Sequence, residues 1–252
     1  MQPARAVLVE ACVDSLASAR QATAGGAGRI ELCANLIEGG VTPSLGMLAM
    51  IREQISVPVH VLIRPRGGDF LYDEDEMAVM LRDIAGCRAI GADGVVIGTL
   101  SPGGTIDGAT TRRLVEAARP LAVTFHRAFD LAREPRAALE ELVALGIERV
   151  LTSGQARTAE AGIPALARLV SQAGGRITIL AGGGVDESNA ARIVRVTGVR
   201  EIHIRGSRVT TSAMEFRRDG VTMGKSYQPD EYRRVETDSE RVRAIVSEVT
   251  SR

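Results

Sequence analysis

The sequence predicts an α/β protein: a single (β/α)8 TIM barrel over residues 1–252, with an irregular segment after the eighth strand and a closing C-terminal helix. Three observations predict it. Short apolar runs alternate with longer amphipathic runs along the whole chain, which is the βαβα order of a parallel sheet. Eight such units fit in the 252 residues, as a closed barrel requires. A glycine-to-strand pattern also recurs up to the last unit.

Eight runs rich in β-branched residues are the expected strands, and the runs between them carry apolar residues at the three-to-four spacing of helices. The expected strands are 6–12, 29–33, 58–64, 94–98, 121–126, 149–153, 177–181 and 201–205. Helical patterns include 15–26, 74–91, 135–146 and 187–198. The segment from Gly206 to Thr237 shows neither pattern and is expected to be irregular.

An internal repeat supports closure of the barrel. GGAGRIEL (25–32), GADGVVIG (91–98), GIERVLTS (146–153) and GVREIHIR (198–205) share one design. A glycine ends a helix in the left-handed conformation, and a strand begins shortly afterwards. The copies precede every second strand, which indicates a fourfold repeat of a two-unit block. An open doubly wound sheet is the alternative, but it would not extend this repeat to the last strand.

Composition excludes several classes of protein. Thirty-one basic and 31 acidic side chains give zero formal charge, and aromatic residues make up 3%, so neither nucleic acid nor a membrane surface is an expected partner. The N-terminus resembles neither a signal peptide nor a membrane span. Three cysteines, an odd number, do not form a disulfide framework, and a reducing cytoplasmic setting is expected.

Polar residues occupy one face of most strands. In 201–205, for example, Ile202 and Ile204 oppose Glu201, His203 and Arg205. Because the surrounding helices need apolar partners, the polar faces should point into the barrel. Applied to the other strands, the same parity places further polar side chains inside: Glu10, Cys12, Glu31, Cys33, His60, Arg64 and His126.

Two interpretations of this polar interior stay open: an ionic network that only stabilises the barrel, and an active site at the C-terminal mouth, where this fold places its chemistry. Glu31, Arg64 and His126 lie nearest the C-terminal ends of their strands and are the candidate catalytic residues. His60 lies deeper and is expected to be structural.

The loop IRPRGGDF (63–70) predicts an anion site. Arg64 and Arg66 place two guanidinium groups after the third strand, and such forks bind carboxylate or phosphate oxygens in pairs. Arg64 should point into the mouth. Arg66 should lie higher on the rim, where pairing with Asp69 as a brace is the favoured role.

Glycines in the seventh and eighth loops form a second candidate anion site. AGGGV (181–185) and RGSR (205–208) place Gly183, Gly184, Gly206 and Ser207 where this fold often binds a phosphate through backbone N–H groups. The alternative is that these glycines serve only tight turns.

Six motifs in order resemble the CutC family, whose members are described as copper homeostasis proteins. They are VEACVDSLASA, GRIELCANLIEGGVTPS, VHVLIRPRGGDFLY, VTFHRAFD, RVLTSGQ and AGGGV, and the resemblance runs from residue 7 to about residue 226. It implies a (β/α)8 barrel, a cytoplasmic homo-oligomer and binding of Cu(I). It implies no particular reaction.

Two cysteines carry the copper expectation. Cys12 and Cys33 match the cysteine-bearing motifs of the family, and strand parity independently places both on the inner face. Thiolates are the natural ligands of Cu(I). Cys87 lies in a helix and should be packing. One departure stands at HIRGSR, where Arg205 and Ser207 replace the serine and arginine usual after the family's last strand.

Three functions follow from these residues. The first is copper handling through Cys12 and Cys33. The second is an enzyme acting on a small anionic or phosphorylated substrate, with the arginines as clamp, His126 as proton carrier and Glu31 as base. A zinc or manganese site of His126, His203 and Glu31 is a variant of it. The third is a ligand-binding sensor without catalysis. The sequence leaves open whether any reaction is catalysed.

Overall fold

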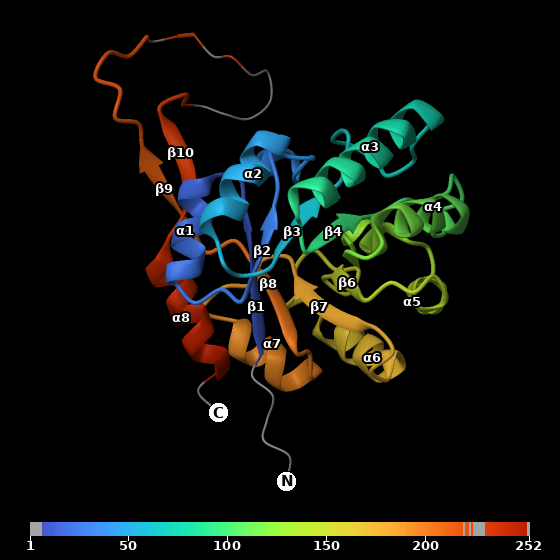
Figure 1. Ribbon diagram of the computed structural model, residues 1–252. Coiled ribbons are helices and arrows are strands. Elements are labelled where there is room, and N and C mark those ends of the chain that lie inside the picture. Colours follow the sequence, from blue (N-terminus) through green and yellow to red (C-terminus); the bar gives the residue numbers. More distant parts are fainter. Residues whose placement is uncertain (1–6, 219, 222, 224–229, 251–252) are drawn as a thin grey trace.

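The computed structural model describes residues 7–218, 220, 221, 223 and 230–250. Eight parallel strands close into a barrel, with β1 bonded to β8 (Figure 1). This confirms the predicted fold, and every strand lies within two residues of its expected bounds. The strands are β1 (Leu8–Val13), β2 (Arg29–Leu32), β3 (Val59–Leu62), β4 (Gly94–Ile97), β5 (Ala122–Phe125), β6 (Arg149–Thr152), β7 (Thr178–Gly182) and β8 (Glu201–Ile204).

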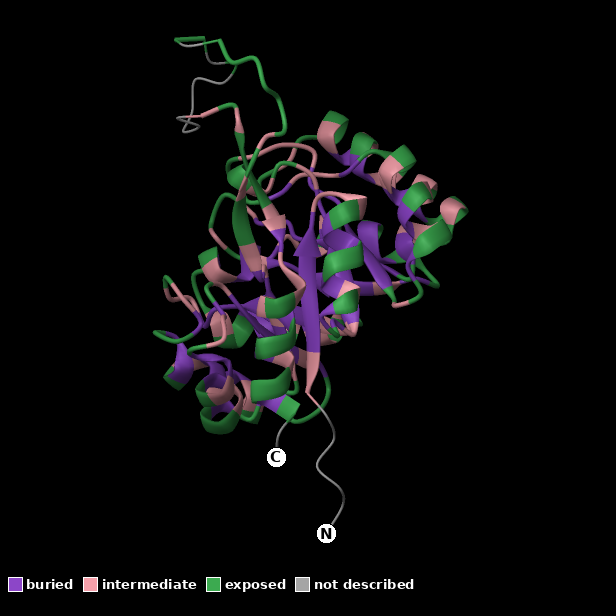
Figure 2. Ribbon diagram, turned by 90° about the vertical axis from the view of Figure 1, so that its left-hand side faces the viewer, coloured by how far each residue is buried: buried purple, intermediate pink, exposed green. Residues whose placement is uncertain are grey.

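Helices connect the strands and form the outer layer. In Figure 2 the strands are buried, whereas the helices expose their outer faces. No helix in the described part of the chain is long and apolar enough to cross a membrane. The helices are α1 (Leu16–Ala24), α2 (Leu45–Gln54), α3 (Glu74–Ile90), α4 (Gly108–Ala118), α5 (Pro135–Ala144), α6 (Ile163–Ala173), α7 (Ala190–Thr197) and α8 (Ser239–Thr250), with short 3-10 helices η1 (Leu36–Glu38) and η2 (Arg127–Leu131).

Local sequence sets the helix ends. Ser15 and Ser44 cap α1 and α2 by accepting backbone N–H groups of the first turn. Asp73 and Glu76 form a reciprocal capping box at the start of α3. That helix ends at Gly91 in the left-handed conformation that the glycine repeat predicted.

The segment after β8 differs from the expectation of an irregular chain. It begins and ends as two antiparallel strands, β9 (Ser207–Thr211) and β10 (Arg233–Thr237), which project away from the barrel (Figure 1). The sequences SRVTT and RRVET lack the apolar alternation of a half-buried strand, since both strands are largely exposed. Pairing partners this far apart in the chain leave no local turn signal.

The lower barrel interior is an ionic network. The guanidinium of Arg29 donates to Glu10 and, at 2.6 Å, to Glu201. Arg149 donates to the same Glu201 carboxylate at 2.6 Å and to the Thr124 hydroxyl at 3.4 Å. Arg29 and Glu10 are almost completely buried. At this level of the barrel the structure shows the ionic network, which was one of the two interpretations of the polar interior.

Two glycines make room for imidazole rings between the strands. A Cβ atom at Gly94 would lie 2.6 Å from Cδ2 of His60, and one at Gly98 would lie 2.2 Å from Cε1 of His126. Any larger residue would displace these rings, so glycine is required here by close approach. His60 is buried below the mouth beside the ionic network, in agreement with a structural role.

Replacing Arg29 by methionine should lower the free energy of unfolding by roughly 3–5 kcal/mol, because the buried carboxylates of Glu10 and Glu201 lose their shared cation. Urea unfolding followed by circular dichroism measures the change. Arg176→Met is the matched control, since its pair with Glu140 is about half exposed and should change stability little. Equal losses in the two variants would contradict a stabilising role for the buried network.

Candidate functional site

A cavity of about 210 Å³ opens at the C-terminal ends of the strands. It combines acidic, basic, thiol and apolar side chains from at least five of the eight units. This is the mouth where the sequence placed its candidate residues. The residues that line it are Cys12, Glu31, Cys33, Leu36, Gly39, Leu62, Arg64, Phe70, His126, Arg127, Leu151, His203 and Arg205.

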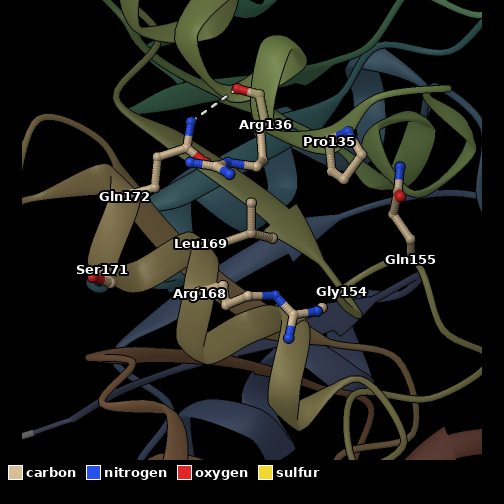
Figure 3. Close-up of a pocket in the computed structure, with 9 residues that line it drawn as sticks. Pro135, Arg136, Gly154, Gln155, Arg168, Leu169, Ser171 and Gln172 are labelled. Carbon is tan, nitrogen blue, oxygen red and sulfur yellow. Dashed lines mark hydrogen bonds between the residues drawn. The ribbon is translucent and has the colours of Figure 1, made fainter.

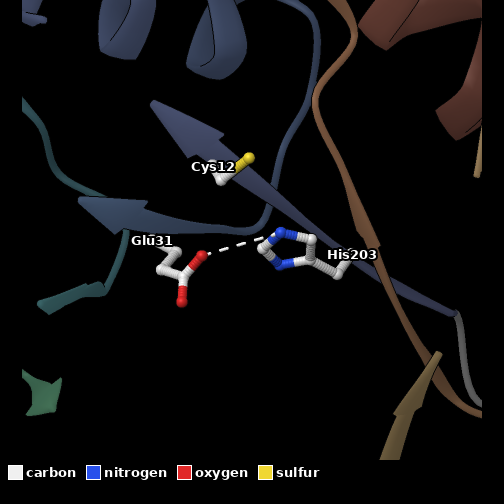
Figure 4. A group of neighbouring side chains, drawn as sticks. All are labelled: Cys12, Glu31 and His203. Carbon is white, nitrogen blue, oxygen red and sulfur yellow. Dashed lines mark ion pairs between the residues drawn. The ribbon is translucent and has the colours of Figure 1, made fainter. Parts of the chain in front are cut away.

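Three side chains meet on one side of this cavity (Figure 4). One ligand atom each of Cys12, Glu31 and His203 lies within 4.8 Å of the other two. They come from β1, β2 and β8, which are adjacent in the barrel. Nε2 of His203 lies 3.6 Å from Oε2 of Glu31. A thiol, a carboxylate and an imidazole so arranged can hold a metal ion.

Glu10 orients the imidazole of this cluster. Nδ1 of His203 lies 2.8 Å from Oε1 of Glu10. The other carboxylate oxygen of Glu10, Oε2, pairs with Arg29. Burial disfavours the charged form of Glu10, but Arg29 and His203 outweigh it and lower the pKa of this carboxyl group. Glu10 is therefore an anion that fixes Nδ1 as the protonated nitrogen and turns Nε2 toward Cys12 and Glu31.

The ionisation of the cluster follows from burial and charge. For His203, burial opposes the imidazolium, yet its interactions with Cys12, Glu31 and Glu10 hold its pKa well above the ordinary value. Burial, followed by neighbouring Glu10, raises the pKa of Glu31. His203 is thus the cation of the cluster, and Glu31 protonates more readily than a surface carboxylate.

Cys33 lies beside this cluster. It follows β2, and its thiol contacts the Glu31 carboxyl group. Burial, together with the charge of Glu31, raises the pKa of Cys33 well above its usual value. Cys33 is therefore a neutral thiol at physiological pH, packed against Leu62 and Leu36. Both predicted cysteines do line one cavity, while Cys87 is buried in α3, as expected.

Arg64 braces two loops and also lines the cavity. Its Nη1 donates to the carbonyl oxygens of Glu38 and Gly40 at 3.0 and 2.8 Å, and its Nη2 donates to Gly68 at 2.8 Å. It braces two loops through carbonyl groups and not through carboxylates. Its Nε is buried without a hydrogen-bond partner among the described residues.

Arg66 lies outside the cavity lining. Its Nε donates to Glu76 at 2.5 Å, and Nη1 pairs with Asp69 at 3.1 Å. Its Nη2 also donates to the carbonyl oxygen of Leu71. These contacts are those of a loop brace, the role favoured for this residue over anion binding.

His126 accepts a hydrogen bond through Nδ1 and keeps Nε2 as a donor atom. Its Nδ1 accepts the N–H of Ala128 at 3.1 Å, so the proton of the neutral ring sits on Nε2. Burial, and then the charge of Arg64, lower the pKa of His126 to about 3. Nε2 is buried and has no partner among the described residues. A ring that stays neutral and keeps Nδ1 occupied suits donation of a hydrogen bond better than the proton transfer expected of it.

Asp130 organises the opposite rim and was not predicted as a site residue. Its carboxylate accepts from Arg127 at 2.7 Å and from the backbone N–H groups of Ser153 and Gln155 at 3.1 Å. It also accepts the hydroxyl of Thr152. Asp130 thereby ties the loop after β5 to the loop after β6. The sequence signal that could have identified Asp130 is its position in the motif VTFHRAFD, four residues after His126.

The glycines of the seventh and eighth loops have mixed surroundings. A Cβ atom on Gly183 would lie 3.2 Å from Cζ of Arg127, so that guanidinium already lies against the loop. The carbonyl oxygen of Gly184 accepts from Asn189. Gly206 packs under Val242 of α8, and Ser207 pairs with Thr237 at the base of the β9–β10 hairpin. The anion site expected at these loops stays a prediction.

A larger hollow of about 510 Å³ lies on the outside, between α5 and α6 (Figure 3). Its amide side chains already have partners. Gln172 donates to the carbonyl oxygen of Arg136 at 2.9 Å, and Gln155 donates to those of Phe129 and Ala132. The mouth, in contrast, holds unpartnered buried donors, and is the better candidate site.

Sequence comparison relates the chain to known proteins. A model of the CutC family matches residues 7–208. A family protein CutC of Chromobacterium violaceum is 51% identical over 238 residues, which are 94% of this chain and 96% of that protein. The copper homeostasis protein cutC homolog of Homo sapiens is 48% identical over 96% of this chain and 89% of its own.

Structural comparison agrees. The crystal structure of a copper homeostasis protein CutC from Streptococcus agalactiae has a TM-score of 0.76 at 34% identity, covering 78% of this chain and 97% of that one. N-(5'-phosphoribosyl)anthranilate isomerase from Pyrococcus furiosus has a TM-score of 0.56 at 14% identity, covering 98% and 100%. The second likeness shows the barrel fold alone.

The three histidines should titrate separately. We expect His203 to stay protonated through neutrality, because negative groups surround it, whereas His60 and His126 should titrate with pKa values of about 4 and about 3. Long-range ¹H–¹⁵N NMR correlations of the ring nitrogens measure this, with single His→Asn variants for assignment. A His203 ring that is neutral at neutral pH would contradict the arrangement around Glu10.

Proposed function

Because the chain belongs to the CutC family, we propose that it is a copper homeostasis protein that binds Cu(I) at the barrel mouth. Relatives at 48% identity carry that name. The proposed setting is the cytoplasm, as a homo-oligomer, and all three cysteines are free thiols, which suits a reducing compartment.

The observation that carries the proposal is the approach of Cys12, Glu31 and His203 to within 4.8 Å. Thiolate and imidazole are ligands that bind Cu(I) well, and two of them satisfy its low coordination number. Cys12 and Nε2 of His203 are therefore the proposed primary ligands. Cys12 and His203 are far apart in the sequence and form no short-spacing motif. They meet because β1 and β8 are neighbours in the closed barrel.

The surroundings support a metal site. Metal-bound imidazoles usually donate their second N–H to a carboxylate, which fixes the ring and raises its basicity. Glu10 accepts from Nδ1 of His203 in this way and is itself held by Arg29. The imidazolium must lose its Nε2 proton when a metal binds, so binding releases a proton.

Cys33 is the third proposed ligand. Its thiol lies against Glu31, and Cys33 lines the same cavity as Cys12. The raised pKa of Cys33 disfavours its thiolate. We therefore assign it a secondary place, to be recruited as a thiolate when the ion enters.

Glu31 supports Zn(II) as the competing metal. Its hard carboxylate oxygen contributes little to Cu(I), but Cys, His and Glu together form an ordinary zinc ligand set. The experiment therefore includes both ions.

Cys12→Ser should weaken Cu(I) binding by more than the roughly 10–100-fold that loss of an outer-shell partner costs. Cys33→Ser should weaken it less, because Cys33 is not part of the closest cluster. Titration with Cu(I) against a competing chelator, repeated with Zn(II), gives both affinities for each protein.

Cys87→Ser is the matched control, since this buried cysteine lies in α3 away from the mouth. Its metal affinities should equal those of the wild type. Equal Cu(I) affinity in all four proteins would exclude the cysteines as ligands, and a strong preference for Zn(II) would replace copper as the ion.

A further inference from the structure

Two buried donors at the mouth lack partners. Nε of Arg64 and Nε2 of His126 each carry a hydrogen, and neither finds an acceptor among the described residues. The two side chains are only 6% and 5% exposed, and both line the cavity. An unsatisfied buried donor is costly, so the pair indicates an acceptor that binds between them.

Both donor residues line the same cavity and lie near the ring of Phe70. The ring of Phe70 lies 4.8 Å from the imidazole of His126. The guanidinium carbon of Arg64 lies 5.0 Å from the centre of the Phe70 ring. The charge of Arg64 also acts on His126, whose pKa it helps to lower. Because Arg64 and His126 line the same small cavity, we take one small molecule there as the common acceptor for both N–H groups.

The charge of Arg64 has no anionic partner in the described part of the chain. Its hydrogen bonds go to the carbonyl oxygens of Glu38, Gly40 and Gly68. Its guanidinium also lies beside the Tyr72 hydroxyl, and no described carboxylate lies within ion-pair distance. A buried guanidinium left in this state is strongly disfavoured unless an anion joins it. The missing acceptor should therefore be negatively charged.

We propose that this corner binds a small monocarboxylate with a short apolar body, one carboxylate oxygen of which accepts hydrogen bonds from Arg64 Nε and His126 Nε2. The apolar side chains Leu36, Leu62, Leu151 and Phe70 line the rest of the cavity. The volume, about 210 Å³, equals roughly seven waters at ~30 Å³ each. The buried carboxyl group of Glu31 at the same cavity disfavours a dianion such as phosphate.

This site is distinct from the proposed copper site and does not depend on it. The copper ligands lie on β1, β2 and β8, whereas Arg64 and His126 follow β3 and β5. A bound carboxylate would lie beside the metal cluster in the same mouth.

Isothermal titration of the full-length protein tests the proposal with butyrate, its neutral isostere butyramide, and inorganic phosphate as probes. Butyrate should bind in preference to the other two. His126→Asn keeps an acceptor for the Ala128 N–H but removes the Nε2 donor, and should weaken butyrate binding roughly 3- to 10-fold. Arg64→Lys should weaken it roughly 10- to 100-fold, because lysine has no charged N–H at the position of Nε.

Arg66→Lys is the matched control, because that arginine is already paired with Glu76 and Asp69, and its butyrate affinity should equal that of the wild type. Absence of butyrate binding, equal affinity in wild type and His126→Asn, or tighter binding of phosphate would each overturn the proposal. Cu(I) affinity of His126→Asn should stay unchanged, so the copper and carboxylate proposals fail separately.

Discussion

The ion pair of Arg29 with Glu10 links the base of the barrel to its mouth. Glu10 accepts from Arg29 on one side and from Nδ1 of His203 on the other. Its negative charge thereby selects which nitrogen of His203 faces Cys12 and Glu31. A network that stabilises the barrel and a cluster that can bind metal are thus one continuous chain of charges. The ionic network of the two interpretations is present at the base, and the active site at the mouth stays a prediction.

Charge is divided across the mouth. The anionic and thiol groups lie on β1, β2 and after β2, while Arg64 follows β3 and the neutral donor His126 follows β5. Under the two proposals, one half binds a metal ion and the other an anion, within a single cavity. Glycine at position 98 permits this arrangement, because it leaves space for the imidazole ring of His126.

Strand parity predicted much of the site, since side chains alternate faces whatever the loops do. It placed Cys12, Glu31 and His203 inside, but grouping them requires the neighbour relation of β1 and β8, which only barrel closure supplies. The partners of Arg64 were beyond prediction. They are carbonyl oxygens presented by a curled loop in which Asn35 and Gly40 take positive φ angles. The β9–β10 hairpin was not predicted, because its two strands show no apolar alternation in the sequence.

The bracing of Arg64 bears directly on binding. Three carbonyl oxygens from two loops occupy its Nη groups and hold the guanidinium plane in one orientation. Nε is therefore fixed before any ligand arrives, which removes the entropy cost of ordering a long side chain. His126 is fixed likewise by the N–H of Ala128 at its Nδ1. Bracing and binding are thus complementary in Arg64, since the contacts that hold the loops also preorganise the donor.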